Sequence, residues 1–523
     1  MKSIFLWSTY VAAALALPGS NHVVNTTSGR FAPYFPPSHP GIASFPNIPY
    51  AKSPVGDLRF AAPQPASPDG DEIQRPTELP AGCLQYLPPF LAGSILTEGL
   101  DGAGLLQRGD YANTTEDCLR LSIFAPKSTT CSKKSKLPVV VWVHGGGYVL
   151  GGNNVPLQLA PNWVQRSQKH IVVQVQYRLG LMGFPNAAGL AADGKNLNVG
   201  LLDQRLAVEW VKQNIEQLGG DPSRIILWGE SAGAYAVDGY LHAWEKDPIV
   251  AGVIADSGNA LLLDTYPNPA GNFTQFSKIA SRFGCENDDA QKELECMRKV
   301  PAADLKNYIQ APSGQGGAFD DNLTFGTLID NITIFANYSN RISSGTGFAK
   351  QIPLLTGTNT NEGAAVVPYN FNGSETATTL PADLQPIADG FNYGEQCYTI
   401  REVRLRHSVG AKTWQYSYAG NFSDISPRPW LGAYHISELP MVFGTFGAGG
   451  KATEFESSVS RHMQDMYLAF AEDPNHGLEK KGWPAASGEV GKKEVMQWGN
   501  GTVHQLVDVA KVREECIKRG YGV

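Results

Sequence analysis

The stretch Ile225–Ala234 holds residues whose types and spacing could carry out nucleophilic catalysis. A short apolar run leads into a G-x-S-x-G pattern with Ser231 at its centre, and small residues follow. A serine that attacks a carbonyl must stand clear of its own backbone, and a sharp turn between a strand and a helix exposes its hydroxyl. The flanking glycines allow the two elements to pass closely. The pattern also arises by chance, so it needs support from elsewhere in the chain.

That support comes from a glycine-rich segment upstream of the serine. The run Leu137–Val143 has the composition and length of a buried strand, and it leads into the segment His144–Gly147, which reads H-G-G-G. Successive glycines let backbone N–H groups face a ligand, and acyl transfer needs such donors where negative charge develops on the carbonyl oxygen. A phosphate-binding loop is the alternative, but the segment lacks both the Lys-Ser/Thr ending and the G-x-G-x-x-G spacing. We therefore expect an oxyanion hole here.

Further strands and a helix must position these two segments. The helix is expected over 199–218, where apolar residues recur every three to four positions, with the breakers Gly219 to Pro222 after it. Further strands are expected at Ile171–Tyr177, Val253–Gly258, Ile352–Gly357 and Trp414–Tyr418. Strand, helix and strand joined by short links require a right-handed parallel crossover. The chain is therefore α/β, with a mostly parallel central sheet flanked by helices.

On these motifs the chain resembles the type-B carboxylesterase/lipase family, which includes cholinesterases and several secreted fungal lipases. The resemblance extends over nearly the whole chain, including the opening signature within 47–60 and the E-D-C-L motif at 116–119. It implies the α/β-hydrolase fold, with loop-rich insertions covering an active-site gorge. It also implies two ion pairs, Arg59–Glu116 and Arg178–Asp203. The expected reaction is hydrolysis of a carboxylic ester through an acyl-enzyme on Ser231, without a metal or cofactor.

Chain order narrows the choice of the catalytic base. The fold places its triad in the order serine, acid, histidine, which leaves His242, His407, His435, His462, His476 and His504. His435 matches the family's G-x-x-H segment. Glu362, followed by glycine, matches its acid, whereas Asp221 and Asp256 are weaker candidates. The imidazole would take the proton of Ser231, and the carboxylate would orient the imidazole.

The resemblance assigns further residues around the triad. The oxyanion donors correspond to Gly146, Gly147 and Ala232. Glu230 is expected in the site without being the triad acid. Ser257 corresponds to a serine behind the catalytic histidine that supports it by a hydrogen bond.

Seven cysteines suggest a disulfide-bonded protein with at least one unpaired thiol. The resemblance implies the pairs Cys83–Cys118 and Cys285–Cys296. The sequence leaves the remaining three open; we expect Cys397–Cys516, with Cys131 unpaired. No C-x-x-C occurs, so a zinc or redox role has little support.

The N-terminus reads as a secretory signal. Lys2 is followed by an apolar run that is too short to span a bilayer comfortably, and an A-x-A cleavage site at 14–16 follows. We expect a signal peptide at 1–16, a single domain at 17–523, and no membrane or GPI anchor. Nine sequons agree with passage through the secretory route: Asn25, Asn113, Asn272, Asn322, Asn331, Asn337, Asn372, Asn421 and Asn500. The net charge of −7 gives no basic surplus for nucleic acid.

The loop from Cys83 to Cys118 bears on the substrate. Choline esterases of this family bind the cation on a tryptophan in this loop, whereas here the aromatic residues are Tyr86, Phe90 and Tyr111. Its apolar residues are better suited to neutral acyl or alcohol groups: Leu87, Phe90, Leu91, Ile95, Leu96, Leu105 and Leu106. We expect a general carboxylesterase acting on neutral, fairly apolar esters. A lipase whose loop is a mobile lid in contact with lipid, a transacylase, and a non-catalytic binding protein remain as alternatives.

Overall fold

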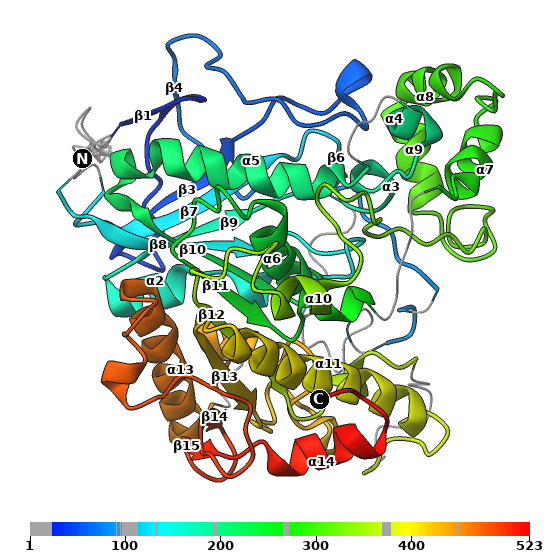
Figure 1. Ribbon diagram of the computed structural model, residues 1–523. Helices are drawn as coiled ribbons and strands as arrows, with labels where there is room; N and C mark the ends of the chain where they lie inside the picture. Colours follow the sequence, from blue (N-terminus) through cyan, green and yellow to red (C-terminus); the bar gives the residue numbers. More distant parts are fainter. Residues whose placement is uncertain are drawn as a thin grey trace, which may run out of the picture.

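A computed structural model describes residues 23–89, 91–94, 96, 113–130, 134–192, 197–264, 271–368, 378–447, 450 and 452–523. Its centre is a ten-stranded sheet with the order β15-β14-β13-β12-β11-β10-β8-β9-β7-β3 (Figure 1). The bounds are β3 Ile42–Pro49, β7 Arg120–Pro126, β8 Leu137–Val143, β9 Ile171–Val175, β10 Gly220–Glu230, β11 Gly252–Asp256, β12 Leu354–Asn359, β13 Thr413–Tyr418, β14 Val495–Trp498 and β15 His504–Val507.

The seven strands from β9 to β14 in this order pair in parallel, and antiparallel strands complete both edges. The expectation of a mostly parallel sheet is confirmed. The central strands of the parallel part, such as β8 and β9, are mostly apolar on both faces because helices cover both. All three expected strands that follow the nucleophile are present, with bounds shifted by one or two residues.

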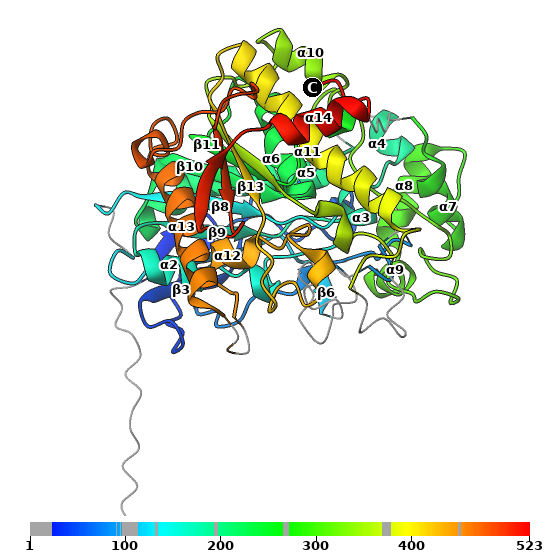
Figure 2. The ribbon, with the colours of Figure 1, turned by 90° about the horizontal axis from the view of Figure 1, so that it is seen from below.

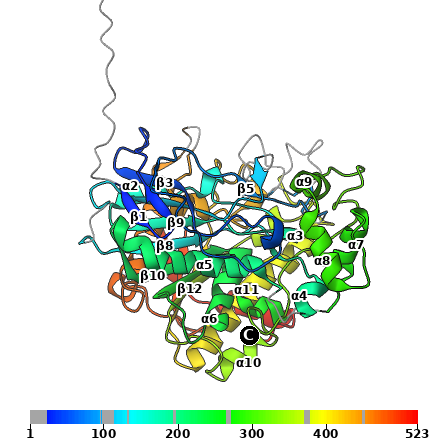
Figure 3. The ribbon, with the colours of Figure 1, turned by 90° about the horizontal axis from the view of Figure 1, so that it is seen from above.

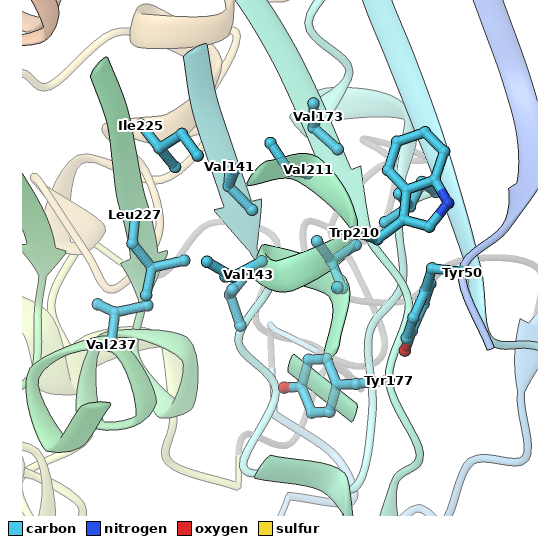
Figure 4. Packing of buried hydrophobic residues seen from close by; sticks show 14 of the residues in the cluster. Tyr50, Val141, Val143, Val173, Tyr177, Trp210, Val211, Ile225, Leu227 and Val237 are labelled. Atoms are coloured by element: carbon cyan, nitrogen blue, oxygen red, sulfur yellow. The ribbon is translucent and has the colours of Figure 1, made fainter. Parts of the chain in front are cut away.

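One face of the sheet packs against α5 (Val199–Asn214) and α6 (Ala232–Ala243). Val141, Val143 and Leu227 on the strands meet Val211 of α5 and Val237 of α6, all buried (Figure 4). Figure 3, seen from above, shows α5 lying across the strands. This face also carries α11 (Gln385–Ser408) and α14 (Ala510–Lys518) toward the β15 edge.

The other face packs against α2 (Pro161–Ser167), α12 (Leu439–Phe443) and α13 (Glu454–Glu472). Trp142 and Trp228 project from neighbouring strands, with ring centroids 4.3 Å apart, and the ring of Phe443 in α12 stacks 4.8 Å from that of Trp228. Alternation of side chains along a strand sends these tryptophans to the face opposite Val141 and Val143. The sheet therefore separates two hydrophobic cores.

Several sequence-based bounds were wrong. The helix expected over 199–218 ends at Asn214 and continues as a 3-10 turn, Ile215–Leu218; Gly219, at φ 91°, ends that turn. The strand before the nucleophile begins at Gly220, and β9 ends at Val175.

The loop-rich insertions that the resemblance implies are partly helical, because the region between Cys285 and Ile352 contains three helices: α8 (Ala290–Lys299), α9 (Ala302–Ile309) and α10 (Tyr338–Ser343). The Asp289 carboxylate caps α8, and Leu294 and Met297 bury one face of it, so its acidic composition concealed an amphipathic helix. Together with α4 (Ala188–Ala192) and α7 (Thr274–Arg282), α8 and α9 form a cluster at one end of the molecule (Figures 1 and 3).

Disulfides join Cys83 to Cys118, Cys285 to Cys296 and Cys397 to Cys516. These match the pairings that we expected, and Cys131 lies outside the described residues. Both expected ion pairs are present and buried, with Arg59 Nε 2.6 Å from Glu116 Oε1 and Arg178 Nη2 2.7 Å from Asp203 Oδ1.

Candidate active site

Ser231 occupies a sharp turn between β10 and α6. Its backbone adopts φ 55° and ψ −124°, a conformation that a residue with a Cβ rarely takes. The turn is held on both sides, because the Ser231 N–H donates to Asp256 O at 2.9 Å and Tyr235 N–H donates to Ser231 O at 3.0 Å. A Cβ at Gly229 would lie 2.3 Å from Gly233 O, so only glycine allows the strand and the helix to pass this closely.

The glycine-rich segment follows β8 and lies against the same turn. Gly146 and Gly147 have φ values of 102° and 62°. A Cβ at Gly146 would lie 2.3 Å from Leu150 O, and one at Gly145 would lie 3.0 Å from the Cβ of Ser231. Ala232 is the first residue of α6, and the first N–H groups of a helix have no partner within it. Gly146, Gly147 and Ala232 line one cavity with Ser231.

His435 and Glu362 meet beside this turn. His435 Nδ1 lies 2.7 Å from Glu362 Oε2, and His435 N–H donates to Glu362 O at 3.2 Å. Both side chains are buried. Glu362 follows β12 and His435 lies on the loop between β13 and α12. The carboxyl ends of neighbouring parallel strands meet at one edge of the sheet, which is why residues 73 positions apart touch here.

The second oxygen of Glu362 is also fixed. Oε1 accepts hydrogen bonds from Ser257 Oγ at 2.7 Å and from Asn359 N–H at 2.6 Å. The Glu362 N–H donates to Asn392 Oδ1 at 3.0 Å. The resemblance predicted that Ser257 lies behind the histidine and supports it by a hydrogen bond. That prediction was wrong about the partner, because the Ser257 hydroxyl donates to Glu362. Ser257 has φ 52°, which turns the chain after β11 toward Glu362.

Glu230 places a second carboxylate beside the imidazole. Its Oε1 lies 3.1 Å from His435 Nε2, and its side chain is fully buried. Its Oε2 fills the space where a Cβ at Gly145 would lie, at 2.6 Å. In the part of the chain that the structure describes, no hydrogen bond joins Ser231 Oγ to His435. The imidazole therefore lies between two carboxylates, with the serine on the wall of the same cavity.

The cavity has a volume of about 180 Å³ and is mostly apolar. Besides the site residues named above, its wall consists of Leu91, Leu96, Tyr148, Leu150, Tyr235, Val366 and Phe391. Leu91 and Leu96 come from the Cys83–Cys118 loop, which the sequence analysis associated with the substrate. Phe90, Ile95, Leu105, Leu106 and Tyr111 of that loop lie outside the described residues.

Sequence reasoning missed two aromatic residues of the cavity wall. Tyr235 is one helical turn after Ser231, so the period of the helix could have indicated it. Phe391 lies on α11 with its ring centroid 5.1 Å from that of His435, edge to face. No local pattern relates Phe391 to the triad, because the contact depends on how α11 packs.

The rival candidates lie away from this geometry. Asp256 accepts from Trp228 Nε1 at 2.6 Å and from Tyr467 Oη at 3.0 Å, and burial raises its pKa to about 7. Asp221 bonds Ser223 and Arg224 at the other end of β10. His242 lies against Gly347 O, and His462 stacks on His504. Among the described residues that follow Ser231, His435 is the histidine that lines the cavity.

Within the described residues there is no group of three or more His, Cys, Asp or Glu that could hold a metal ion. A search of the same residues finds no helix with the length and apolar character needed to cross a membrane.

Known proteins resemble this chain in sequence and in structure. The sequence profile described as the carboxylesterase family matches residues 20–389 and 392–513. Secreted lipase 5 of Gibberella zeae is 58% identical, covering 96% of this chain and 94% of its own. Chlorogenic acid esterase of Aspergillus niger is 38% identical, covering 95% and 94%. A solved PNB esterase superposes with a TM-score of 0.72 at 24% identity, covering 95% of this chain and 99% of its own, which shows a shared fold.

Proposed function

Since the chain belongs to the carboxylesterase family of α/β-hydrolases, we propose that Ser231, His435 and Glu362 form the triad with which it hydrolyses carboxylic esters. The observation that carries this proposal is the buried contact of 2.7 Å between His435 and Glu362, beside the strained turn of Ser231. A nucleophile, a base and an orienting acid on three separate segments are what acyl transfer requires.

The reaction proceeds through a covalent intermediate. Ser231 Oγ attacks the carbonyl carbon and its proton passes to His435 Nε2, while N–H groups of Gly146, Gly147 and Ala232 donate to the oxyanion. The alcohol leaves with the proton from His435. Water, deprotonated by the same nitrogen, then releases the acid and restores Ser231. Hydrogen bonds in an active site often tighten only when substrate is bound, which applies to the pair Ser231 and His435.

Glu362 and Glu230 contact different nitrogens of the His435 ring. Glu362 accepts the Nδ1–H and holds the ring by a bond that Ser257 and Asn359 keep in place. Glu230 lies 3.1 Å from Nε2, the nitrogen that gains the proton, so its charge stabilises the imidazolium of the intermediate. Glu230 would also hold the ring between turnovers.

The substrate class follows from the cavity. Leucine, valine and aromatic side chains form most of its wall, and no tryptophan lies in the Cys83–Cys118 loop to bind a quaternary ammonium group. Each buried methylene contributes about 0.8 kcal/mol, so kcat/KM should rise with acyl chain length until the cavity is filled. A neutral ester should be preferred over a choline ester of the same acyl group, and the reverse preference would contradict the assignment.

The names of two relatives suggest two further classes of substrate to test. The name of secreted lipase 5 supports testing an emulsified triacylglycerol on this chain, with the Cys83–Cys118 loop as a lid at the lipid surface. The name of chlorogenic acid esterase supports testing an ester with an aromatic acyl group, which Tyr235 and Phe391 could contact. Rates with soluble short esters, tributyrin emulsion and chlorogenic acid distinguish these. Including an excess of a short alcohol would reveal transfer to an acceptor other than water.

The triad itself is tested by substitution. Ser231→Ala should abolish ester hydrolysis while the circular dichroism spectrum and melting temperature stay close to those of the wild type. His435→Ala and Glu362→Ala should each lower kcat by several orders of magnitude, and their effects should not add to that of Ser231→Ala. Near-normal turnover in His435→Ala would contradict the choice of base, and a fully active Ser231→Ala would remove the acyl-enzyme mechanism.

We further propose that residues 1–16 direct export and are removed, leaving one domain at 17–523. Two relatives, secreted lipase 5 and secreted lipase 1 of Botryotinia fuckeliana (34% identical), are named as secreted. The eight described sequon asparagines are all exposed, which glycan attachment requires; Asn372 lies outside the described residues. N-terminal sequencing and glycopeptide mapping of protein from a eukaryotic host test both statements.

A further inference from the structure

A second and larger cavity is lined by residues of β12 to β15, α11 and α14. It has a volume of about 620 Å³, within the range of about 300–1,000 Å³ common for small-molecule sites. Its floor is the end of the sheet formed by β12 to β15, and its walls are α11 and α14. These two helices lie side by side and are joined by Cys397–Cys516 (Figures 1 and 2).

The floor of this cavity is a row of neutral polar side chains. Thr358, Ser417, Gln497 and Gln505 are successive register partners across four neighbouring strands. All four line the cavity. Neighbouring strands lie about 4.8 Å apart, so the row spans roughly 14 Å. The same face of the sheet carries valines and leucines beneath α5 and α6, whereas at this end it carries polar side chains.

Several of these groups lack a partner within the protein. Gln415 is 6% exposed and lines the cavity, and its Oε1 accepts no hydrogen bond from the described chain. The hydroxyls of Thr358, also 6% exposed, and of the half-buried Ser417 make none to the described chain either. Buried polar groups nearly always have partners, and one left unpaired costs about 1–3 kcal/mol. A ligand or solvent in the cavity must supply them.

The residues that line the cavity also indicate which charge and shape of ligand it would accept. Asp508 and Lys511 are of opposite sign, and the carboxylate of Asp508 already accepts from Gly491 N–H and Ala510 N–H. The rest of the wall is neutral. Ile400, Val495, Val507 and Val509 add apolar surface beside the amides and hydroxyls. Hydroxyl groups around an apolar ring face fit this combination, whereas an anion, a cation or a hydrocarbon does not.

We propose that this cavity is a second binding site, for a neutral saccharide of one or two rings. The site reaches the surface at Asn500 and Lys511, both exposed. It is separate from the ester cavity, with which it shares no lining residue.

The saccharide site is connected to the triad by hydrogen bonds. Gln396 lines the second cavity and donates to Asn392 Oδ1 at 2.9 Å and to Asn359 O at 3.2 Å. Asn392 Oδ1 accepts from the Glu362 N–H, and Asn359 N–H donates to Glu362 Oε1. A sugar that binds Gln396 therefore contacts a side chain that is two hydrogen bonds away from the proposed catalytic acid. This second statement rests on the proposed function, and the binding itself does not.

Binding is measured on the full protein by ligand-observed NMR and calorimetry with glucose, galactose, maltose and cellobiose. We expect saturable binding of at least one sugar, with a dissociation constant on the order of 1 mM or below. Glucuronate and cyclohexanol serve as charged and apolar comparisons and should bind more weakly. Ser417→Val, which suits a strand and faces an empty volume, should weaken binding at least about ten-fold.

Control variants distinguish a loss of sugar binding at this cavity from a general loss of folding. Ser343→Val changes an exposed serine of α10 and should leave sugar binding as it is in the wild type. The melting temperature of each variant reports folding. Asn500→Gln removes the sequon at the mouth, and binding that is stronger in this variant would support the site and indicate a glycan over its entrance. No saturable binding by any of the sugars, in either the wild type or Asn500→Gln, would overturn the proposal.

The connection between the saccharide site and the proposed triad is tested by enzyme kinetics. At a saturating concentration of the sugar that binds, kcat/KM for a neutral ester should change at least about two-fold, and Ser417→Val should remove this change. Binding without any change in kcat/KM would overturn the connection and leave the saccharide site standing. An enzyme inactive toward all esters would refute the proposed function, while the binding measurements would still decide the site.

Discussion

At the scale of single residues, the site depends on how Glu362 is held. Each oxygen of its buried carboxylate has a defined partner: Oε2 faces His435, and Oε1 accepts from Ser257 and from the backbone of Asn359. A carboxylate fixed in this way cannot rotate, so the imidazole that it orients keeps one tautomer and one direction. In the proposed mechanism, Ser257 therefore acts through Glu362 without touching substrate.

Ser257→Ala should lower kcat about 10- to 100-fold, because a hydrogen bond to a charged group is worth about 1.5–3 kcal/mol. KM should change little, since Ser257 does not line the ester cavity. Steady-state kinetics with a soluble ester measures both constants, and Ser281→Ala on the surface of α7 is the control. An equal loss in Ser281→Ala, or a loss confined to KM, would refute the positioning role.

Glu230→Gln keeps the size of the side chain but removes the charge beside His435 Nε2. We expect kcat to fall at least about ten-fold, because the imidazolium of the intermediate loses a stabilising carboxylate. Glu472→Gln, at the exposed end of α13, should leave kcat unchanged. If Glu230→Gln retained the wild-type kcat, its contact of 3.1 Å with the imidazole would have no catalytic role.

The sequence predicts some of these residues and not others, for a physical reason. Ser231 and the glycines near it have a local signature, since a strained turn and a close approach of backbones restrict the residue types. His435 and Glu362 were found through resemblance and chain order, and the structure brings them together. Phe391 and the saccharide site could not be predicted, because they arise from the packing of distant helices on the sheet.

At the scale of elements, the start of α13 shows how side chains satisfy the free backbone groups at a helix end. α13 begins with a capping box, in which Thr453 Oγ1 accepts from Glu456 N–H at 3.1 Å and Glu456 Oε2 accepts from Thr453 N–H at 3.3 Å. Burial raises the pKa of the Glu456 carboxyl to about 8, with Asp424 adding to the effect. α13 packs against the core that contains Trp228, so the start of this helix supports β10 and its turn.

Thr453→Ala should lower the free energy of unfolding by about 1 kcal/mol, the usual cost of losing an N-cap. Ser458→Ala, at a half-buried position of the same helix, should cost less because alanine is the better helix former there. Urea denaturation followed by circular dichroism measures both. A loss for Ser458→Ala as large as that for Thr453→Ala would show that the cap contributes nothing specific.

At the scale of the whole molecule, buried titrating groups make stability depend on pH in two opposing ways. Burial lowers the pKa of His170 and His242 to about 3 and that of His144 to about 4. Such a histidine is neutral in the fold but gains a proton on unfolding below pH 6.5, so its contribution is intact above pH 6.5 and is lost as the pH falls. Asp256, raised to about 7, acts in the opposite direction between pH 4 and 7.

His170→Gln isolates one of these contributions. Between about pH 6.5 and 3 the wild type should lose stability relative to the variant, by up to about 1.4 kcal/mol per pH unit. His407→Gln changes an exposed ring and should follow the wild type. Denaturant titrations at a series of pH values give the difference, and parallel curves for wild type and His170→Gln would contradict the assignment.

The wide spacing of the site along the chain has a consequence for the timing of activity during synthesis. The proposed nucleophile, Ser231, leaves the ribosome before the proposed acid, Glu362, and the proposed base, His435, which lies 204 residues after the serine. At about 5–20 residues per second, roughly 10–40 s separate the appearance of the nucleophile from that of its base. The β12 and β13 strands that carry the acid and base loops must also pair before the two meet. A growing polypeptide with this order of parts lacks the proposed base, so under the proposed mechanism ester hydrolysis begins only when the last third of the chain has joined the sheet.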